Sequence, residues 1–333
     1  MKAFFITRYV KADVLTAGDL PMPVLGDDDV MVQVHAAGVN PLDNKIRSGE
    51  FKLLLPYKMP LILGNDVAGV VVGVGARVRR FKPGDEVYAR PDDARIGGFA
   101  EFIAIREDAL ARKPANLSME EAASLPLVAL TAWQALAEKG QLKRGQRVLI
   151  HAGSGGVGTV AIQLARYLGA TVATTASAGN AAMLKELGAD IVIDYKSEDF
   201  ATRLQDYDLV LDTQGGATLK KSLDVLRPGG KLIGIAGPPD PAFASERGVN
   251  GFVSLVMRLL SHGIRSAAGR RGASYAFHFM TASGAQLDEI TRLVEAGHIR
   301  PVVERVFPFA QTGQALDYVE RGRVKGKVVV KVR

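Results

Sequence analysis

The chain has 333 residues, 47% of them hydrophobic, a length and composition that favour about two folded domains and exclude a disordered chain. Cysteine is absent, which excludes disulfides, thiolate catalysis and every cysteine-based zinc site. The net charge of +7 attracts polyanions without specificity, whereas the lack of a long apolar run or a secretory signal predicts a cytoplasmic protein with no membrane partner.

Residues 1–115 are predicted to form short strands separated by glycine turns. Val30, Val32 and Val34 recur with period two, which places them on one face of a strand. The glycine-rich stretch 66–75 predicts a buried strand with bends. Such a succession is typical of a small barrel-like β domain.

At Ser118 the hydrophobic period becomes helical. Ser118 and Glu121 have the spacing of a capping box, and apolar positions at helical spacing continue to Ala137. One helix is therefore predicted from this box to Ala137.

Residues 147–177 predict a strand, a tight turn, a helix and a second strand. The turn contains Gly153-x-Gly155-x-x-Gly158, which is the dinucleotide fingerprint in its required context. The first glycine permits the turn, the second lets a pyrophosphate approach the backbone, and the third lets the helix pack on the strand. The N–H groups that open the helix favour phosphate. The stretch therefore predicts a dinucleotide site.

The end of the second strand indicates which dinucleotide binds. An NAD site usually has an acidic residue there for the ribose 2′-hydroxyl, whereas this strand ends at Ser177 and the next acid is Glu186. A serine hydroxyl can donate to a 2′-phosphate that a carboxylate would repel. Lys185, Tyr195 and Lys196 are candidates for the rest of the pocket, and NADP(H) is the predicted cofactor.

Beyond this site strands and helices alternate, which predicts a doubly wound parallel sheet in an α/β protein. The basic region from Arg258 to Arg271 is interpreted as a solvated helix-loop face rather than a nucleic-acid surface. Strands at 275–280, 302–307 and 327–332, with helices at 284–296 and 312–321, are predicted to complete the first domain.

The whole chain resembles the medium-chain dehydrogenase/reductase superfamily, within it the zinc-free, zeta-crystallin-like quinone oxidoreductase branch. The resemblance rests on segments along the entire chain, which are residues 37–43, 64–69, 81–87, 123–126, 130–133, 152–158, 188–195 and 326–329. It implies a discontinuous GroES-like catalytic domain over 1–120 and 273–333, and a Rossmann NADP-binding domain over 121–272.

The departures from the zinc alcohol dehydrogenases suggest the chemistry. Those enzymes have a cysteine ligand where this chain has Asn40, and Gly-His-Glu where it has Gly64, Asn65 and Asp66. Without His or Cys these positions cannot make the usual zinc site, so no metal is expected. The expected reaction is hydride transfer from NADPH to a quinone or enone, whose developing negative charge is delocalised without a Lewis acid.

The resemblance also implies roles for individual residues. Asn40, Asp43 and Lys45 are the candidate catalytic residues, with Asn40 donating to a substrate oxygen. At Lys45 the chain departs from the family, whose members have a tyrosine there, and the lysine is the candidate proton or hydrogen-bond donor to the reduced oxygen. The candidate cofactor-binding residues are Thr131, Ser154, Gly155, Gly156, Val157, Gly158, Ser177, Tyr195, Thr213, Ala236, Phe277 and Phe279.

Alternative functions stay open. A reductase of 2-alkenal or enoyl double bonds would use the same hydride and differ only in pocket shape. A carrier of NADPH or an RNA-binding protein of the zeta-crystallin type is the alternative of another class, although no nucleic-acid-binding motif is present. Residues 277–280 imply a homodimer, by resemblance alone.

Overall fold

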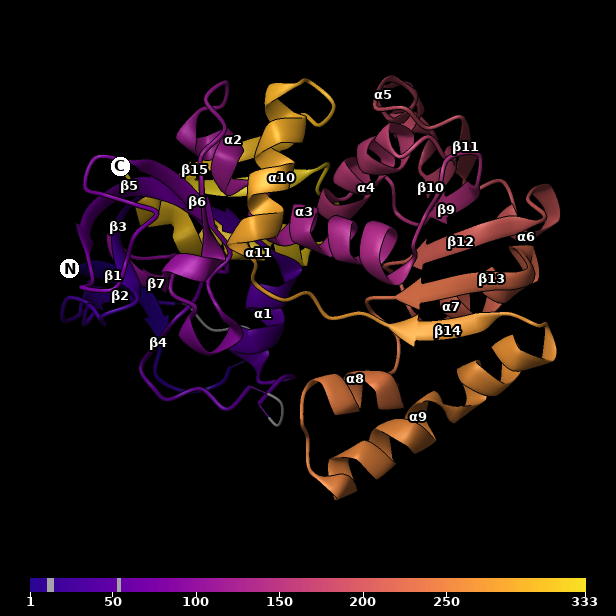
Figure 1. Ribbon diagram of the computed structural model, residues 1–333, viewed down its shortest axis with the longest axis horizontal. Coiled ribbons are helices and arrows are strands. Elements are labelled where there is room, and N and C mark those ends of the chain that lie inside the picture. The colour runs from indigo at the N-terminus through magenta and orange to yellow at the C-terminus, as the bar shows by residue number, and fades with distance from the viewer. Residues whose placement is uncertain (11–14, 53–54) are drawn as a thin grey trace. The chain divides into compact units, whose positions relative to one another are not determined.

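The computed structural model describes residues 1–10, 15–52 and 55–333, which form two compact units (Figure 1). Unit 1 comprises Met1–Leu130 and Thr281–Arg333, and unit 2 comprises Thr131–Met280. Both termini belong to unit 1. The two junctions lie somewhat later in the chain than the predicted domain limits.

Unit 1 is built mainly from antiparallel strands. Its strands are β1 (Lys2–Ile6), β2 (Thr16–Asp19), β3 (Asp29–Val39), β4 (Leu61–Ile62), β5 (Asp66–Val74), β6 (Glu86–Ala89), β7 (Phe102–Arg106), β8 (Leu110–Arg112), β15 (Val303–Pro308) and β16 (Lys327–Lys331). Its helices are α1 (Pro41–Ser48), α2 (Met119–Ala123), α10 (Gly284–Glu295) and α11 (Thr312–Glu320). A small sheet has the order β2-β1-β4, and a larger one has the order β15-β16-β3-β5-β6-β8, with β7 also paired to β3.

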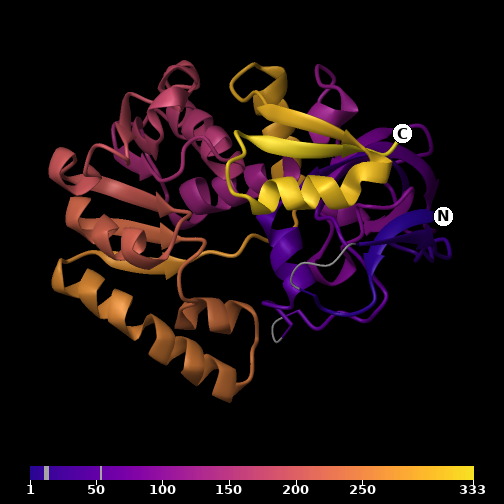
Figure 2. The same cartoon turned by 180° about the vertical axis from the view of Figure 1, so that it is seen from behind.

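Strand β3 organises the core of unit 1. Val30, Val32 and Val34 are buried on one face, as their period of two predicted. The same strand pairs with β5, β7 and β16, so the C-terminal segment of the chain completes a sheet that begins near its N-terminus. Figure 2 shows β15, β16 and α11 together in yellow, and α11 packs against both strands.

Unit 2 is a doubly wound α/β domain. Its strands are β9 (Arg147–Ile150), β10 (Thr171–Ala176), β11 (Ile191–Asp194), β12 (Tyr207–Asp212), β13 (Leu226–Gly234) and β14 (Ser274–Phe277). Its helices are α4 (Gly156–Tyr167), α5 (Ala181–Glu186), α6 (Phe200–Arg203), α7 (Gly216–Lys221), α8 (Pro241–Glu246) and α9 (Gly251–Arg270). The sheet has the order β11-β10-β9-β12-β13-β14, and every pairing in it is parallel. This confirms the predicted fold class.

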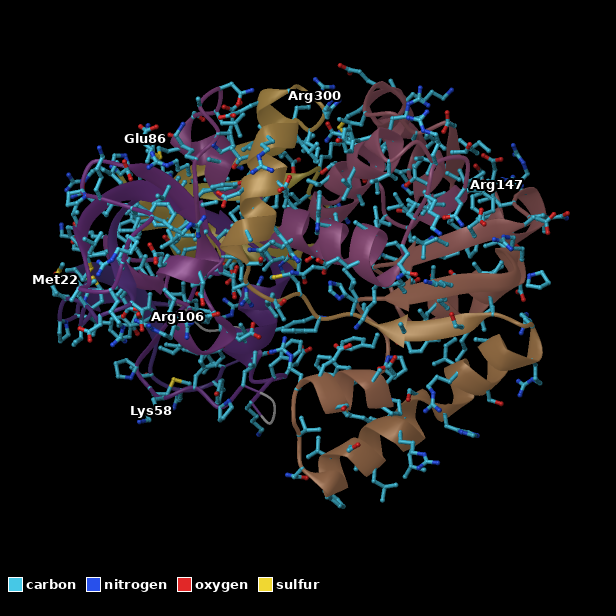
Figure 3. All side chains as sticks on the ribbon, in the orientation of Figure 1. Met22, Lys58, Glu86, Arg106, Arg147 and Arg300 are labelled. Carbon is cyan, nitrogen blue, oxygen red and sulfur yellow. The ribbon has the colours of Figure 1, made fainter. Side chains whose placement is uncertain are left out.

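The strand order reverses between β9 and β12. Because parallel crossovers are right-handed, α4 and α5 cover one face of the sheet and α7 covers the other. Ligands of such sheets bind beyond the carboxyl ends of the strands at this reversal. The opposite edge contains Arg147, labelled in Figure 3, whose guanidinium lies over the Tyr207 ring at 4.6 Å.

The single helix predicted from Ser118 to Ala137 is wrong, because the structure has two helices there. The capping box is confirmed, since the Glu121 N–H donates to Ser118 Oγ at 3.2 Å and the Ser118 N–H to Glu121 Oε2 at 2.9 Å. Helix α2 nevertheless ends at Ala123, because Pro126 disfavours helical backbone in the residue before it. Pro126 opens a second helix, α3 (Pro126–Trp133), which continues as a π-helix over Gln134–Lys139.

One further correction concerns the region before α10. The strand predicted at 275–280 does not complete the first domain, because β14 pairs with β13 in the sheet of unit 2 and ends at Phe277. The basic region from Arg258 to Arg271 lies in helix α9 up to Arg270, and Arg271 follows in the turn after the helix, as the predicted helix-loop segment requires. Among the described residues, no helix is both long and apolar enough to cross a bilayer.

Candidate active site

Three polar residues from distant segments meet at one end of the larger sheet of unit 1. Asn40 follows β3, Asp66 begins β5, and Lys327 begins β16. The pairings Val39 to Val328 and Gly38 to Asp66 bring these positions side by side. The register of the sheet therefore assembles a site that no local motif could form.

Asp66 is the centre of this cluster. Its Oδ2 accepts hydrogen bonds from Asn40 Nδ2 at 2.8 Å and from Lys327 Nζ at 2.9 Å. Its Oδ1 accepts from the Leu127 N–H at 2.6 Å, in the first turn of α3, where the helix dipole favours an anion. Asp66, Asn40 and Lys327 are at most 5% exposed. The lysine and the carboxylate thus form a buried ion pair with further hydrogen bonds to the acid.

Asp43 extends the network through α1. Its two carboxylate oxygens accept from Asn65 Nδ2 and from the Asn40 N–H, each at 2.7 Å. Burial raises the pKa of the Asp43 carboxyl to about 6, although both hydrogen bonds and Lys327 lower it. The position of Asp43 at the start of the helix makes it the acidic half of a capping box with Asn40.

Both polar atoms of the Asn40 side chain are hydrogen-bonded, since Oδ1 accepts from Lys327 Nζ and Nδ2 donates to Asp66. Lys45 lies on the exposed side of α1, and the described residues show no hydrogen bond from its amine to the network. Lys327 was missed by sequence reasoning. The one available signal was a lysine directly before three valines in the predicted last strand.

These residues do not suit a zinc ion. Zinc in proteins prefers Cys, His and carboxylate ligands, and here a lysine ammonium bonds both Asn40 and Asp66 within the network. Among the residues that the structure describes, no group of three or more His, Asp or Glu side chains is arranged to hold a metal.

In unit 2, almost every predicted cofactor residue follows the carboxyl end of a strand. Because all these strands are parallel, their carboxyl ends meet at one edge of the sheet. Ser154 comes after β9, Ser177 after β10, Tyr195 after β11, Thr213 after β12, Ala236 after β13 and Phe279 after β14, where Phe277 is the last strand residue. The exception is Thr131, which is buried in α3.

The glycines of the fingerprint have different surroundings. A Cβ at Gly153 would lie 2.1 Å from Thr174 Oγ1, and one at Gly158 would lie 2.4 Å from the Ala152 carbonyl oxygen. A Cβ at Gly155 would meet only the Ala152 carbonyl oxygen, at an ordinary 3.4 Å. Packing within the protein therefore requires the first and third glycines but not the second.

The first turn of α4 offers the groups that a pyrophosphate needs. Gly155 is the N-cap residue, so the N–H groups of Gly156 and Val157 have no acceptor within the helix. Ser154, Gly155, Gly156 and Val157 are half-buried, whereas Gly158 is buried. These residues fit the pyrophosphate of a dinucleotide.

Ser177 and Tyr195 lie at the ends of the neighbouring strands β10 and β11. Ser177 Oγ accepts a hydrogen bond from Asn180 Nδ2 at 3.1 Å, which orients the hydroxyl and leaves its hydrogen available. Tyr195 is 61% exposed at the end of the adjacent strand. Asp194 is an acid beside this strand end, because it pairs with Ala176 in register. Its two carboxylate oxygens already accept hydrogen bonds from the Lys196 N–H and the Ser197 hydroxyl.

The remaining candidates are held by loop contacts. Gly215 has φ +71°, and a Cβ there would lie 2.5 Å from the Ala236 carbonyl oxygen, so the loops after β12 and β13 are adjacent. Phe243 contacts the rings of both Phe277 and Phe279, at centroid distances of 5.0 and 6.2 Å. Thr213 Oγ1 donates to the His151 carbonyl oxygen at 3.2 Å.

His151 is a core residue whose two ring nitrogens both have hydrogen-bond partners. Its Nε2 lies 2.9 Å from the Ser222 hydroxyl, which itself donates to the Thr218 carbonyl oxygen, so Nε2 is the donor of the pair. Its Nδ1 then accepts from the Thr175 hydroxyl at 3.0 Å. Burial lowers the pKa of His151 to about 4, which keeps the ring neutral at pH 7.

Asp212, at the carboxyl end of β12, predicts a pH-dependent stability. Burial raises the pKa of its carboxyl from 3.8 to about 6, against the hydrogen bonds from the Gly215 and Gln214 N–H groups, which lower it. The native state therefore binds this proton more tightly than the unfolded state, and stability falls as the pH rises from about 4 to about 6. Between about pH 4 and pH 6, Asp212→Asn should remove about 1–3 kcal/mol of the change in the free energy of unfolding.

Urea denaturation of the wild type and of Asp212→Asn across this pH range measures the difference. Asp206→Asn, an exposed change in the same unit at a left-handed position that asparagine tolerates, is the matched control. Equal slopes for the wild type and Asp212→Asn would show that Asp212 does not titrate in this range.

Comparison with known proteins agrees with this architecture. The family described as zinc-binding dehydrogenase matches residues 187–330, and the alcohol dehydrogenase GroES-like domain matches residues 26–115. The mitochondrial NAD(P)H oxidoreductase RTN4IP1 of Danio rerio is 38% identical over all of this chain and 91% of its own length. The chloroplastic NADPH-dependent alkenal/one oxidoreductase of Arabidopsis thaliana is 35% identical over 99% of this chain and 79% of its own.

Among solved structures, the quinone oxidoreductase from Coxiella burnetii superposes with a TM-score of 0.86 at 32% identity, covering 100% of this chain and 99% of that one. The chain belongs to the medium-chain dehydrogenase/reductase superfamily, in its quinone oxidoreductase branch. It is thus an oxidoreductase of the class that uses a nicotinamide cofactor.

Proposed function

We propose that this chain transfers hydride from NADPH to quinones or related conjugated carbonyl compounds, without zinc. The observation that carries the proposal is the buried cluster of Asn40, Asp66 and Lys327. In it the lysine ammonium is hydrogen-bonded to the side-chain oxygens of Asn40 and Asp66, which a catalytic metal would need as ligands. A substrate of this site must delocalise its own developing charge, as quinones and enones do. The quinone oxidoreductase and alkenal/one oxidoreductase named among the similar proteins support this substrate class.

Bound NADPH would supply the hydride, and the residues of unit 2 would hold it. The N–H groups of the first turn of α4 bind the pyrophosphate, and Ser177 and Tyr195 bind the 2′-phosphate. Thr131, Thr213, Ala236, Phe277 and Phe279 surround the ribose and nicotinamide.

In unit 1, we assign substrate roles to residues at or near the network. Asn40 Nδ2 uses one hydrogen for Asp66, and its second hydrogen can polarise a substrate oxygen. Lys327 and Asp66 hold that amide in one orientation. Asp43 fixes the backbone of Asn40 at the start of α1, and the exposed amine of Lys45 supplies the proton to the reduced oxygen.

The experiment is a comparison of NADPH and NADH oxidation against para-quinones, ortho-quinones and 2-alkenals, with and without a chelator. Rapid NADPH-dependent turnover that the chelator leaves unchanged, in protein without stoichiometric metal, is the expected result. A preference for 2-alkenals would establish the alternative reductase, which the Arabidopsis relative favours. Tight NADPH binding without turnover of any acceptor would overturn the proposal.

Cofactor choice has its own prediction. Ser177→Asp should weaken NADPH binding by roughly a hundredfold and leave NADH binding unchanged or tighter, because a carboxylate repels the 2′-phosphate and accepts from a ribose hydroxyl. Fluorescence titration with each nucleotide measures this. Ser177→Ala, which removes only the hydroxyl, should cost NADPH about tenfold. Equal losses for both nucleotides in Ser177→Asp would contradict the assignment.

We also propose a homodimer formed through the free edge of β14, and a cytoplasmic location. Strand β14 ends the order of its sheet and, among the described residues, pairs only with β13. An unpaired edge of this kind is a ready surface for strand addition. Sedimentation velocity that finds a monomer at micromolar concentration would overturn the dimer, and cell fractionation tests the location.

A further inference from the structure

Helix α9 has an apolar face that unit 2 does not cover. Its exposed residues Phe252, Leu255, Val256 and Leu259 follow the spacing of one side of a helix, and Leu260 borders them. Phe252 is 76% exposed, Leu259 66% and Leu260 63%. Single exposed apolar side chains are ordinary in proteins, but a continuous stripe marks an interaction surface.

A different side of α9 attaches it to unit 2. Met257, Ser261, Ile264 and Ala268 are buried and also recur at helical spacing, and the helix packs against α8 and β14. Figure 1 shows α9 beneath β14 at the edge of the sheet, and Figure 3 shows side chains on both sides of the helix. The stripe is therefore additional to the packing face.

The charge along α9 has a single sign. No Asp or Glu occurs between Glu246 and Asp288, whereas this segment contains the exposed residues Arg258 and Arg270. Arg258 is exposed and follows Phe252 by six residues, which places it beside the stripe. Arg270 lies about five turns after Phe252, in line with the stripe. The helix thus combines an apolar face with a border of arginines.

We propose that α9 docks this protein on a membrane surface that contains anionic phospholipid. The stripe would enter the boundary between headgroups and acyl chains, and the arginines would pair with the phosphates, which is the arrangement of interfacial amphipathic helices. A second copy of this chain suits the face less well, because two such helices would bring their arginines together, and the helix itself has no acid to pair with them.

This inference goes beyond the proposed reaction and stands without it. It also replaces the sequence-based expectation of no membrane partner, which rested on the absence of a membrane-spanning run. A helix that lies in the interface needs no such run, because only one of its faces leaves water.

The experiment is co-sedimentation of the full chain with phosphatidylcholine vesicles, with and without roughly one-third phosphatidylglycerol. Binding to the anionic vesicles, at least tenfold weaker without phosphatidylglycerol and weakened again by about 0.5 M salt, is expected. Leu255→Glu with Leu259→Glu should reduce binding at least tenfold, and Arg258→Gln with Arg270→Gln should reduce it several-fold.

The matched control is Val24→Glu with Val306→Glu, which makes the same charge change at exposed apolar positions of unit 1 and should leave binding unaltered. Circular dichroism confirms the fold of each variant. No binding by the wild type, equal binding to both kinds of vesicle, or equal loss in the control would overturn the proposal. So would conversion of a dimer to a monomer by Leu255→Glu with Leu259→Glu, since the stripe would then be the surface between two copies.

Discussion

Replacing Lys327 with methionine is expected to lower the free energy of unfolding by about 3–5 kcal/mol, because it leaves a buried carboxylate without its cation. Asp66 is fully buried and would keep only the hydrogen bonds from Asn40 and the Leu127 N–H. Methionine fills a similar volume, so the loss reports the charge rather than a cavity. Urea denaturation followed by far-UV circular dichroism measures it.

Two further variants separate the buried pair from other effects. Lys331→Met removes a lysine from the same strand, but this lysine is 57% exposed in its pair with Glu120 and should contribute under about 1 kcal/mol. Lys327→Met combined with Asp66→Asn removes both charges and should recover most of the loss. Two results would show that the two charges are not coupled. One is a free energy of unfolding for Lys327→Met within about 1 kcal/mol of the wild type, and the other is a double variant no more stable than Lys327→Met.

The fold of unit 2 could be predicted because its signals are local. Gly153, Gly155 and Gly158 lie within six residues, and the strands and helix around them have periods that a short window detects. The capping box at Ser118 is equally local. The break after it at Pro126 could also have been predicted from the restriction that proline places on the preceding residue.

The network of unit 1 could be predicted only in part. Asn40 was predicted as a candidate catalytic residue, and Asp66 was noted only as a departure from the zinc ligands. Lys327 lies 287 residues from Asn40 and joins it only through the register of β16 against β3. A lysine at the start of a valine strand is usually solvated, and nothing in its neighbourhood in the sequence indicates burial.

Helix α9 illustrates another limit. Its apolar residues form two sets at helical spacing, Phe252 to Leu259 and Met257 to Ala268, and periodicity cannot decide which set faces the protein. Only the packing against α8 and β14 shows that the second set is buried. The sequence alone therefore favoured a solvated basic segment.

The second large effect concerns the middle glycine of the fingerprint. Gly155→Val is expected to weaken NADPH binding by roughly a hundredfold or more while changing the free energy of unfolding by less than about 1 kcal/mol. Gly155 has φ −80° and ψ 172°, a conformation that valine adopts readily, and the nearest atom to an added Cβ is 3.4 Å away. The protein itself does not require glycine here, whereas a pyrophosphate against the first turn of α4 does.

The matched variants make that separation measurable. Gly158→Val places its Cβ 2.4 Å from the Ala152 carbonyl oxygen and should lower stability and binding together, because the third glycine is needed for packing. Gly313→Val, in a helix of unit 1 where an added Cβ meets nothing within 4 Å, should change neither binding nor stability by much. Fluorescence titration with NADPH and urea denaturation give both quantities for each variant.

If Gly155→Val bound NADPH as tightly as Gly313→Val, the phosphates would not lie at this turn, and the assignment of α4 as the anion-binding helix would be wrong. If it lost stability as Gly158→Val does, the second glycine would be a packing residue, and its place in the fingerprint would say nothing about the ligand.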